Sequence, residues 1–420
     1  MKFSNSEIDV LKAIFFLDSP TRYEIVRRTG LSLVSVGSAI DRLVESGMVS
    51  IAGKTSSKGG RPSILYRLVE GLGGAIGIFV GIDRCHLVAI NANRQILDER
   101  RFYLDIPASP GNYLNDLLDQ VSSQVRQFMK GERLQMVFAP GKSLEGMISP
   151  GQSLFGRHGF VVGVAVPGMV DTERGVWLHG LQVSGIEHVD LASKFGAAIG
   201  SPALIEDPAR CIAYLAASRL GRLAAGNLVL LYLGEGVGAG IVIDGVLYRG
   251  SHGLAGEVGH LVVDPGGIRC ACGNVGCLET VLSLPSILRL FQQRLAEGVI
   301  SSLQQVGSQN LTIEHIRESA SAGDRLALRT LFELGGLLGE ACARIIQLYN
   351  PQTLLVGGPA GILGDFFQEA AWQKIRLQVF PEMLVDLKLE FIASLPGDEA
   401  LGSALIAQRW AWERIDKLNL

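Results

Sequence analysis

Residues 256–279, GEVGHLVVDPGGIRCACGNVGCLE, carry the pattern that decides the fold of the body of this chain. His260, Cys270, Cys272 and Cys277 supply one imidazole and three thiolates within this short stretch, which glycines interrupt. These ligand types at such spacing can close a tetrahedral shell around Zn²⁺, with no position left open. We therefore predict one structural Zn²⁺ per chain, worth on the order of 10 kcal/mol to the ordering of this loop. The alternative is a chance cluster of cysteines or a redox pair.

Two carboxylates are tied to this loop, because Glu257 stands three residues before His260 and Glu279 stands two residues after Cys277. A rigid carboxylate is a good acceptor for the hydroxyl groups of a sugar. Either residue can instead be an ordinary solvated or helix-capping acid. The pair is therefore a candidate sugar site that needs support from other positions.

Glycine- and proline-bearing turns follow several apolar strands. In GEGVGAG, backbone amides can cradle a phosphate group, although such a hairpin is also a common structural device. The glycines of this segment are Gly234, Gly236, Gly238 and Gly240. Two further turns, at Gly168 and at residues 206–208, follow strands where an α/β cleft gathers its ligand groups.

The sequence from residue 76 onward alternates strands with helices. IGIFVGI, CHLVAIN and RQILDERRFYL are typical of three antiparallel strands, and a helix and another strand follow. The same order begins again at LVLLYLGEG, so we predict two α/β lobes with a cleft between them. The first lobe is expected at 71–205, completed by a C-terminal helix at 398–420, and the second, with the zinc loop, at 206–397. Residues 130–160 have no clean period and are predicted to form a surface insertion.

Residues 1–70 form a small basic head, with 10 Lys and Arg against 7 Asp and Glu. Three short helices precede two strands that KTSSKGGRP joins, which is the pattern of a winged helix-turn-helix. We predict that the third helix lies in the major groove of double-stranded DNA and that an arginine of the wing enters a narrow A·T-rich minor groove. The predicted DNA contacts are Ser35, Val36, Ser38, Arg42, Lys54, Lys58 and Arg61. A dimerisation or protein-docking module is the alternative.

The composition of the whole chain limits the class of protein. Of 420 residues, 48% are hydrophobic and 19% charged, with a net charge of -3, which excludes a disordered chain, a coiled-coil fibre and a basic nucleic-acid-coating protein. No apolar run reaches the roughly 20 residues of a membrane helix, and charged residues near the start disfavour a signal peptide. We therefore expect a cytoplasmic protein, in which six cysteines favour a metal site over disulfides.

These motifs resemble the ROK family of repressors, open reading frames and sugar kinases, over a span from Leu11 to about Gln408. The wing with GGRP is similar to the repressor branch, and GEVGH with CACGNVGCLE is similar to the family signature. The resemblance implies an actin-like or hexokinase-like (ribonuclease H-like) body of two α/β lobes, with the zinc held by the four residues named above. It also implies a sugar bound by the acids of the two motifs, with the free edge of the metal-bound imidazole near a hydroxyl. The full predicted sugar-binding set is Gly168, Glu206, Asp207, Glu257, His260 and Glu279.

The chain departs from the kinases of this family at two places. Where the kinases carry an Asn-Asp pair whose Asp is the general base, this chain has Asp207 and Pro208. Where they carry an Asp-x-Gly-x-Thr phosphate loop, Phe79 replaces the Asp and Asp83 brings a negative charge near the phosphate. A shift by one residue would let Glu206 or Asp207 serve as the base.

The winged head, the family signature and the two departures from the kinases together predict a sugar-responsive transcriptional regulator without kinase activity. We expect a repressor of carbohydrate-metabolism genes, in which the phosphate loop at 234–240 is vestigial. We expect it to bind a palindromic operator as a homodimer or homotetramer, with the sugar changing the placement of the heads. Two alternatives stay open at this point. One is an ATP-dependent sugar kinase with a fused DNA-binding head, and the other is a regulator that a protein partner controls without any sugar.

Overall fold

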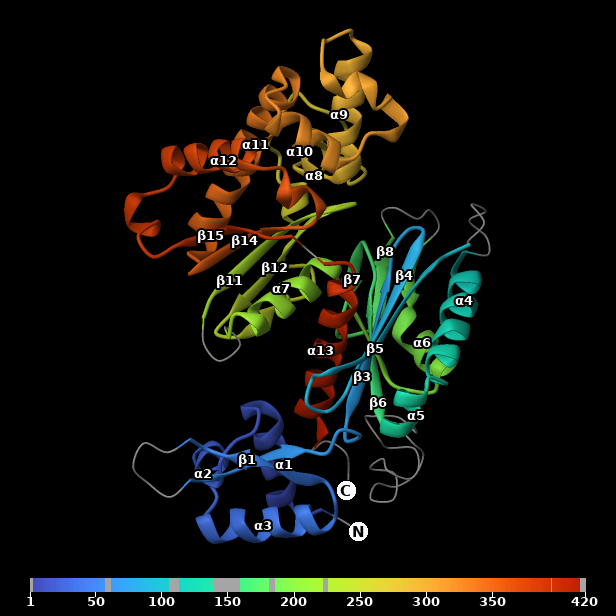
Figure 1. The fold of residues 1–420 in the computed structure, drawn as a ribbon, viewed down its shortest axis with the longest axis vertical. Coiled ribbons are helices and arrows are strands. Elements are labelled where there is room, and N and C mark those ends of the chain that lie inside the picture. Colours follow the sequence, from blue (N-terminus) through green and yellow to red (C-terminus); the bar gives the residue numbers. More distant parts are fainter. Residues whose placement is uncertain are drawn as a thin grey trace. The chain divides into compact units, whose positions relative to one another are not determined.

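The computed structural model describes residues 3–56, 62–105, 113–138, 159–180, 186–221, 226–393 and 395–415 (Figure 1). The chain forms two compact units, the first from Met1–Pro208 with Glu399–Leu420 and the second from Ala209–Asp398. The polypeptide therefore passes from one unit to the other twice, at 208–209 and at 398–399. Within the described ranges, no helix has the length and apolar content needed to span a membrane.

The head consists of three helices and a two-stranded hairpin, as the sequence predicts for a winged helix. Its elements are α1 (Asn5–Leu17), α2 (Arg22–Thr29), α3 (Leu33–Glu45), β1 (Val49–Lys54) and β2 (Ile64–Leu68). Capping boxes begin α1 at Ser4 and α2 at Thr21, where hydroxyl and glutamate side chains satisfy the free amides reciprocally. Gly30 ends α2 in the left-handed conformation, with φ 72°. The tip of the hairpin, 57–61, lies outside the described residues.

The first lobe is built on a five-stranded sheet with the order β10-β6-β3-β4-β5. Its strands are β3 (Gly74–Val80), β4 (Arg84–Ile90), β5 (Ile96–Tyr103), β6 (Phe160–Ala165) and β10 (Ala203–Glu206). β3, β4 and β5 pair antiparallel, as their sequence predicts, and β6 and β10 join in parallel. The sheet shares one apolar core with α4 (Tyr113–Phe128), α5 (Glu132–Val137) and α6 (Leu191–Ile199). A small antiparallel sheet consists of β7 (Met169–Asp171), β8 (Val176–His179) and β9 (Glu187–Asp190).

The segment that we expected to be a surface insertion begins with a helix. α5 lies within 130–160 and contributes a buried leucine, Leu134, to the core of the first lobe. Residues 139–158 of this segment lie outside the described residues. The short length of α5 explains why no helical period was visible in the sequence.

The second unit repeats the same sheet, with the order β13-β12-β11-β14-β15. Its strands are β11 (Leu228–Leu233), β12 (Val237–Ile243), β13 (Val246–Tyr248), β14 (Thr353–Gly357) and β15 (Lys388–Phe391). As in the first sheet, the first three strands in chain order are antiparallel and the last two join in parallel. The repeated order and strand directions confirm the predicted body of two α/β lobes.

Among the described residues of the second unit, six α-helices lie before or between the strands of the sheet in chain order. They are α7 (Pro208–Arg219), α8 (Glu279–Leu282), α9 (Leu284–Ala296), α10 (Ile313–Ser321), α11 (Arg325–Tyr349) and α12 (Asp365–Gln378). α11 and α12 pack closely at Gly335, where an added Cβ would overlap the carbonyl oxygen of Phe367. Their apolar faces join the core of the second sheet.

Each sheet is contacted by a helix that follows a crossing between the units. α13 (Asp398–Glu413) packs on the first sheet, where a Cβ at Gly77 would overlap the carbonyl oxygen of Ala400 and one at Gly163 that of Ser403 (Figure 1). α7 packs on the second sheet, where a Cβ at Gly240 would lie 2.7 Å from a helix carbonyl oxygen. Glycine in the strands is therefore what allows both helices to lie directly on the sheet backbone.

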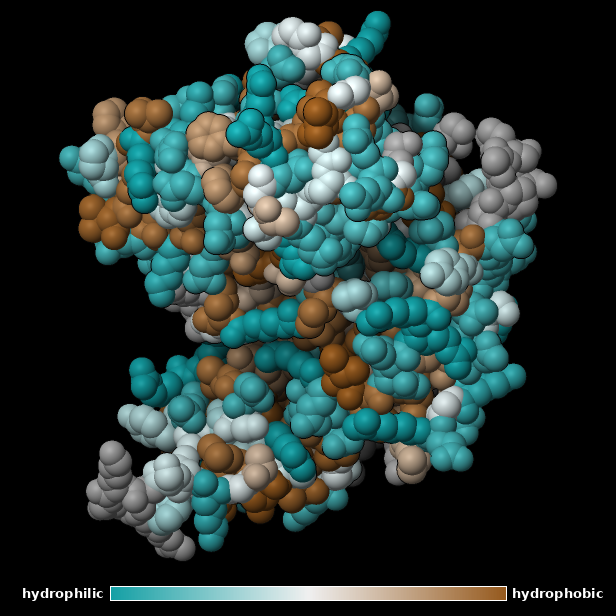
Figure 2. All heavy atoms as spheres, turned by 45° about the horizontal axis from the view of Figure 1, so that its top comes forward, coloured by the Kyte–Doolittle hydropathy of each residue, from teal (hydrophilic) through white to brown (hydrophobic). Residues whose placement is uncertain are grey.

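The surface is mixed in polarity. Figure 2 shows hydrophilic side chains over most of one face, with apolar ones scattered among them. The large apolar side chains at the end of α12 and just beyond it, Leu377, Phe380 and Val385, are 84%, 72% and 76% exposed. Single exposed apolar residues are normal on protein surfaces and carry no functional meaning by themselves.

Two adjacent glycines on α11 provide a matched test of this packing. Gly335→Ala should destabilise the second unit by about 1 to 3 kcal/mol, because the backbone of α12 must move to admit the methyl group. Gly336→Ala should instead stabilise it by about 0.5 to 1 kcal/mol, because no atom lies within 4 Å of a Cβ there and alanine restricts the unfolded chain. Thermal unfolding followed by circular dichroism should give a melting temperature below that of the wild type for Gly335→Ala and above it for Gly336→Ala. Equal shifts would contradict the close packing of α11 on α12.

Candidate functional site

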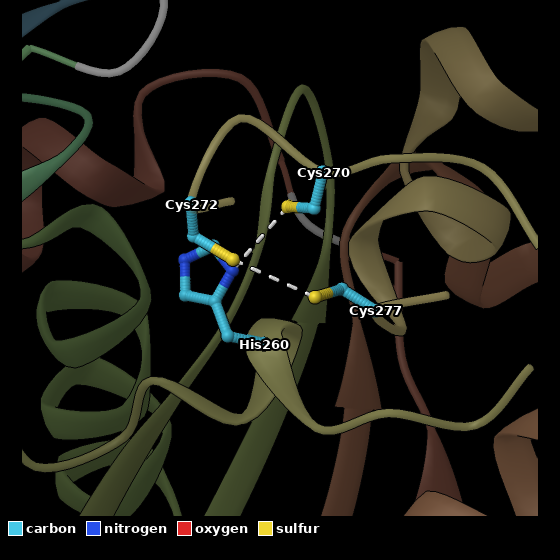
Figure 3. Close-up of side chains that lie close together, drawn as sticks. All are labelled: His260, Cys270, Cys272 and Cys277. Carbon is cyan, nitrogen blue, oxygen red and sulfur yellow. Dashed lines mark hydrogen bonds between the residues drawn. The ribbon is translucent and has the colours of Figure 1, made fainter. Parts of the chain in front are cut away.

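The side chains of His260, Cys270, Cys272 and Cys277 point toward one another in the second unit (Figure 3). Their ligand atoms all lie within 4.8 Å of one another. The Sγ atom of Cys270 is 3.6 Å from Nδ1 of His260, and the Sγ atoms of Cys272 and Cys277 are 3.6 Å apart. Ligands of a tetrahedral ion with bonds of about 2.0 to 2.3 Å lie about 3.5 to 3.8 Å from each other. The four predicted ligands therefore come together at a spacing that can hold a metal ion.

Backbone contacts fix the shape of this loop. Val262 and Cys277 form an antiparallel bridge, which brings the two ends of the loop together. Gly276 has φ 73°, and a Cβ there would overlap the carbonyl oxygen of Asp264. The guanidinium of Arg344 on α11 donates a 2.8 Å hydrogen bond to the carbonyl oxygen of Val262, so the loop is attached to the long central helix.

The thiols of the cluster differ in their environment. Burial, reinforced by the neighbouring sulfur atoms, raises the pKa of Cys277 to about 12, and burial also raises the pKa of Cys270. A backbone hydrogen bond from Asn274 lowers the pKa of Cys272. Metals bind thiolates rather than thiols, and three adjacent thiolates repel one another unless a cation lies between them. The donor set is therefore suited to a soft, divalent ion.

The two predicted acids are positioned by the same loop. Oε2 of Glu257 lies 3.9 Å from Nε2 of His260, whose other ring nitrogen faces the sulfur atoms. A metal bound at Nδ1 would fix the ring with Nε2 directed toward Glu257, whose side chain is 32% exposed. Oε2 of Glu279 accepts a 3.0 Å hydrogen bond from the backbone N–H of Val237, at the start of β12.

The glycine-rich segment joins β11 to β12 in a tight turn, in which the N–H of Gly234 donates to the carbonyl oxygen of Gly236. The later glycines face α7. A Cβ at Gly238 would lie 3.4 Å from Cβ of Ala209, and one at Gly240 would be closer still to the same helix. Close packing on α7 therefore explains Gly240, whereas a Cβ at Gly238 would make an ordinary van der Waals contact. A phosphate-binding role of the turn stays a prediction.

The remaining predicted sugar contacts lie in the first unit. Gly168 has φ 106°, and a Cβ there would overlap the backbone of β8. Glu206 is only 1% exposed, and its Oε1 accepts hydrogen bonds from Oγ1 of Thr172 at 3.1 Å and from the N–H of Asp207 at 3.0 Å. The carboxylate of Glu206 therefore holds the turn in which Asp207, half-buried, precedes Pro208.

Sequence analysis missed Thr172 and the buried Arg210. Arg210 is 1% exposed and donates from Nη1 to the carbonyl oxygen of Gly253. Thr172 lies 34 residues from its partner Glu206, and no local motif connects them. The only available signal was the polar residue type in an otherwise apolar helix start, ARCIAYLAA.

Aromatic rings pack at the β3–β4 hairpin, where the resemblance implies a degenerate first phosphate loop. The ring of Phe79 lies 3.3 Å from the position of a Cβ at Gly81, and the His86 ring packs edge-on at 6.0 Å between centroids. Burial, reinforced by two nearby arginines, lowers the pKa of His86 and so favours the neutral ring. At the tip, the side chain of Asp83 is 69% exposed and lies 3.9 Å from Arg84.

The outer face of α3 carries most of its predicted DNA contacts. Ser35 and Ser38 are exposed, but Val36 is fully buried, so the prediction that it contacts DNA is wrong. Val36 belongs to the apolar stripe that continues through Ile40, a spacing of four residues that places both on the core side. Val34, which is 82% exposed, takes the outward position instead.

The basic residues of the head have different surroundings. Nε of Arg42 donates a 2.8 Å hydrogen bond to Oε1 of Glu7 on α1, so this guanidinium is held against the head. Burial raises the pKa of Glu7, but hydrogen bonds from the capping serine and from Arg42 outweigh it and lower the pKa overall. Lys54 is exposed at the end of β1, whereas Lys58 and Arg61 lie outside the described residues.

Comparison with known proteins gives consistent matches along the chain. A model described as the ROK family matches residues 139–409. A xylose repressor of Caldicellulosiruptor bescii is 27% identical over 388 residues, which are 91% of this chain and 90% of the repressor. The DNA-binding transcriptional repressor Mlc of Escherichia coli is 27% identical over 411 residues, 94% of this chain and 91% of Mlc. A glucokinase of Halalkalibacterium halodurans is 30% identical over 253 residues, 59% of this chain and 76% of the kinase.

A solved structure shares the fold over nearly its whole length. A ROK family transcriptional regulator, described as a homolog of E. coli Mlc, matches with a TM-score of 0.75 at 24% identity. The match covers 97% of this chain and 96% of that regulator. The winged head and the duplicated body thus occur together in another protein.

The prediction that this cluster holds a metal ion can be tested by removing one sulfur donor. Cys272→Ser should lower the metal content of the purified protein from one ion per chain toward zero, because a hydroxyl is a poor substitute for a thiolate. The matched control is Cys342→Ala, which removes a fully buried thiol of α11 outside the cluster and should leave the metal content unchanged. Inductively coupled plasma mass spectrometry measures both. A Cys272→Ser protein with one ion per chain would exclude Cys272 from the ligand set.

Proposed function

The chain belongs to the ROK family, and on that premise we propose that it is a DNA-binding transcriptional repressor whose operator affinity responds to a sugar or sugar derivative. One observation carries this proposal. Relatives named as repressors match over 91% and 94% of the chain, whereas the glucokinase matches over 59%. The two repressor matches are long enough that they must include much of the winged head, which a kinase does not need.

The head supports DNA binding through the exposed face of α3. The N-terminal residues of a recognition helix contact base edges in the major groove, and here Val34, Ser35 and Ser38 face outward. Lys54 at the end of β1 is placed to contact a phosphate group. Lys58 and Arg61 complete the interface in the proposal, with the arginine in an A·T-rich minor groove.

The sugar is proposed to bind where the metal loop presents its polar groups. Glu257, Glu279 and Nε2 of His260 offer acceptors and a donor for hydroxyl groups, and the loop orients all three. Gly168 and Asp207, which lie in the first unit, are the remaining members of the predicted sugar-binding set. Glu206 acts behind them, because its buried carboxylate fixes the turn at Asp207 rather than reaching a ligand.

The metal is proposed to be a single structural Zn²⁺. One imidazole and three thiolates match the ligand preferences of this ion, and four protein ligands leave no position for a reacting water molecule. When bound, the ion supplies the charge that the thiolates need and keeps the His260 ring in one orientation. Its role is therefore to shape the sugar site and not to take part in a reaction.

The proposal excludes phosphoryl transfer. A sugar kinase needs a general base beside the attacking hydroxyl, and Pro208 offers no acceptor at the corresponding position. The kinases' Asp in the first phosphate loop would help to hold Mg²⁺, and the ring of Phe79 occupies that place against Gly81 and His86. We therefore propose that the protein binds a sugar but does not phosphorylate it.

Regulation requires that two heads read one operator. We propose a symmetric homodimer or homotetramer on a palindromic, A·T-rich site, since the two-fold symmetry of the protein then matches that of the DNA. A sugar that binds one arrangement of the heads more tightly shifts the equilibrium toward it. No protein partner is needed for this response.

DNA binding can be tested on the fragment upstream of the protein's own gene. Fluorescence anisotropy should show specific binding that at least one of glucose, xylose or N-acetylglucosamine changes. Ser38→Glu should weaken this binding about tenfold or more, because it brings a negative charge to the groove. Ser123→Glu, on the exposed side of α4, makes the same change of charge in the body and should leave the affinity unchanged. Equal effects of the two variants, or binding that no sugar alters, would contradict the proposal.

The absence of kinase activity is measured separately. With ATP, Mg²⁺ and each of the three sugars, a coupled assay should detect no release of ADP above background, because no base removes the proton of the attacking hydroxyl. Pro208→Asp restores a carboxylate at this position while the aromatic turn at Phe79 persists, and it should also remain inactive. Sugar-dependent ADP release by the wild-type protein would overturn this part of the proposal.

A further inference from the structure

An aromatic side chain of the head is held by two residues of the body. Phe15 on α1 is 4% exposed and stacks on Trp412 of α13, with ring centroids 5.0 Å apart and planes inclined by 15°. The guanidinium of Arg94, in the turn between β4 and β5, lies 4.6 Å from the centroid of the Phe15 ring. Its Nη2 also donates a 2.9 Å hydrogen bond to the carbonyl oxygen of Phe15. We call these three residues the head clamp.

Further contacts join the head to the same end of α13. Nζ of Lys12 donates to the carbonyl oxygen of Glu413 at 3.3 Å, and the guanidinium of Arg409 lies 5.8 Å from the centroid of the Phe16 ring. Trp412 itself is fully buried. Aromatic stacking and cation–π contacts are directional, so this interface favours one orientation of α1.

The head clamp connects to the DNA-reading helix through α1. About two turns before Phe15 on α1, Glu7 pairs with Arg42 of α3 at 2.8 Å, and the Glu7 side chain is only 11% exposed. α1 ends at Leu17, two residues after Phe15, and the next two residues, Asp18 and Ser19, have positive φ angles of 51° and 65°. A rotation of α1 about the clamp therefore moves α3 with it.

α13 continues the connection into the body. Nε2 of Gln408 donates 2.9 Å hydrogen bonds to the carbonyl oxygens of Gly73, just before β3, and Asn91, just after β4. α13 also lies on the first sheet at Gly77 and Gly163, so this helix joins the sheet to the head within the first unit.

We propose that the head clamp is the element through which the body sets the orientation of the DNA-reading helix. With Phe15 stacked on Trp412 and covered by Arg94, α1 and α3 are held in the orientation of this structure. When the stack is lost, the head is free to reorient and must be ordered again on DNA, which weakens binding. The inference rests on the proposed function and adds to it the residues that carry the regulation. A sugar acts through the clamp if it favours the stacked or the open state.

Hydrogen exchange of the full-length protein, without DNA or sugar, tests the clamp itself. Trp412→Leu should speed amide exchange in the second half of α1 by about tenfold or more, because local opening becomes easier. Trp410→Leu is the matched control on the same helix, since Trp410 is only half-buried and packs against Arg414 at 5.1 Å. Trp412→Phe keeps an aromatic ring and should return exchange toward the wild type. Equal exchange in Trp412→Leu and Trp410→Leu would overturn the proposal.

A second variant avoids the buried position. Arg94 has φ 63°, and asparagine accepts this conformation, so Arg94→Asn removes the guanidinium without straining the turn. It should speed exchange in α1 in the same direction as Trp412→Leu. Exchange at the wild-type rate in a folded Arg94→Asn protein would show that the guanidinium does not hold the head.

DNA affinity separates the clamp from the proposed function. On the fragment from upstream of the gene and without sugar, Trp412→Leu should weaken binding about tenfold while Trp410→Leu retains the wild-type dissociation constant. Unchanged affinity in Trp412→Leu would overturn the regulatory role even where exchange has increased. A wild-type protein that binds no DNA would refute the proposed function, and the exchange experiment would still decide whether the head is clamped.

Discussion

The structure depends on the direct contact of two helices with the backbone of two sheets. α13 lies on Gly77 and Gly163 of the first sheet, and α7 lies on Gly240 of the second. Each of these helices begins where the chain crosses from one unit to the other, at 208–209 and 398–399. Any side chain at the glycines would push a helix away from its sheet and move the start of that helix. Because residues 206 and 207 lead directly into α7, the position of their side chains depends on this packing.

The features that could be predicted from sequence are those that neighbouring residues determine. The metal cluster follows from short spacing within one loop, and the winged head from caps, turns and periods of three or four residues. Predictions stayed incomplete where contacts between distant segments of the chain determine the surroundings of a residue. The packing of α7 on Gly240 and the hydrogen bond from Thr172 to Glu206 both join distant segments, and no local pattern in the sequence indicates either one. Val36 was different, because its helical spacing already placed it on the core side.

The proposed loss of catalytic groups is compatible with retention of the fold. Pro208 is the first residue of α7, where a backbone N–H has no partner within the helix and the fixed φ of proline suits the helix start. If proline stands here in place of the kinases' catalytic carboxylate, as the resemblance implies, the proton acceptor is lost without cost to the helix. Phe79 likewise finds packing partners in Gly81 and His86. A binding protein and a kinase can thus share this scaffold, because the positions that perform chemistry are not the ones that support packing.

The metal loop contacts other elements of the second unit besides holding its four predicted ligands. Arg344 ties it to α11, and Glu279, two residues after Cys277, ties it to the first amide of β12. The same loop directs Nε2 of His260 toward Glu257. If an ion fixes the cluster, it fixes the donor and both acids of the proposed sugar site at once, since all three extend from one short segment. The affinity for a sugar must then depend on the order of the loop as well as on the hydroxyl groups of the sugar. Metal binding is therefore a precondition of the proposed sugar response.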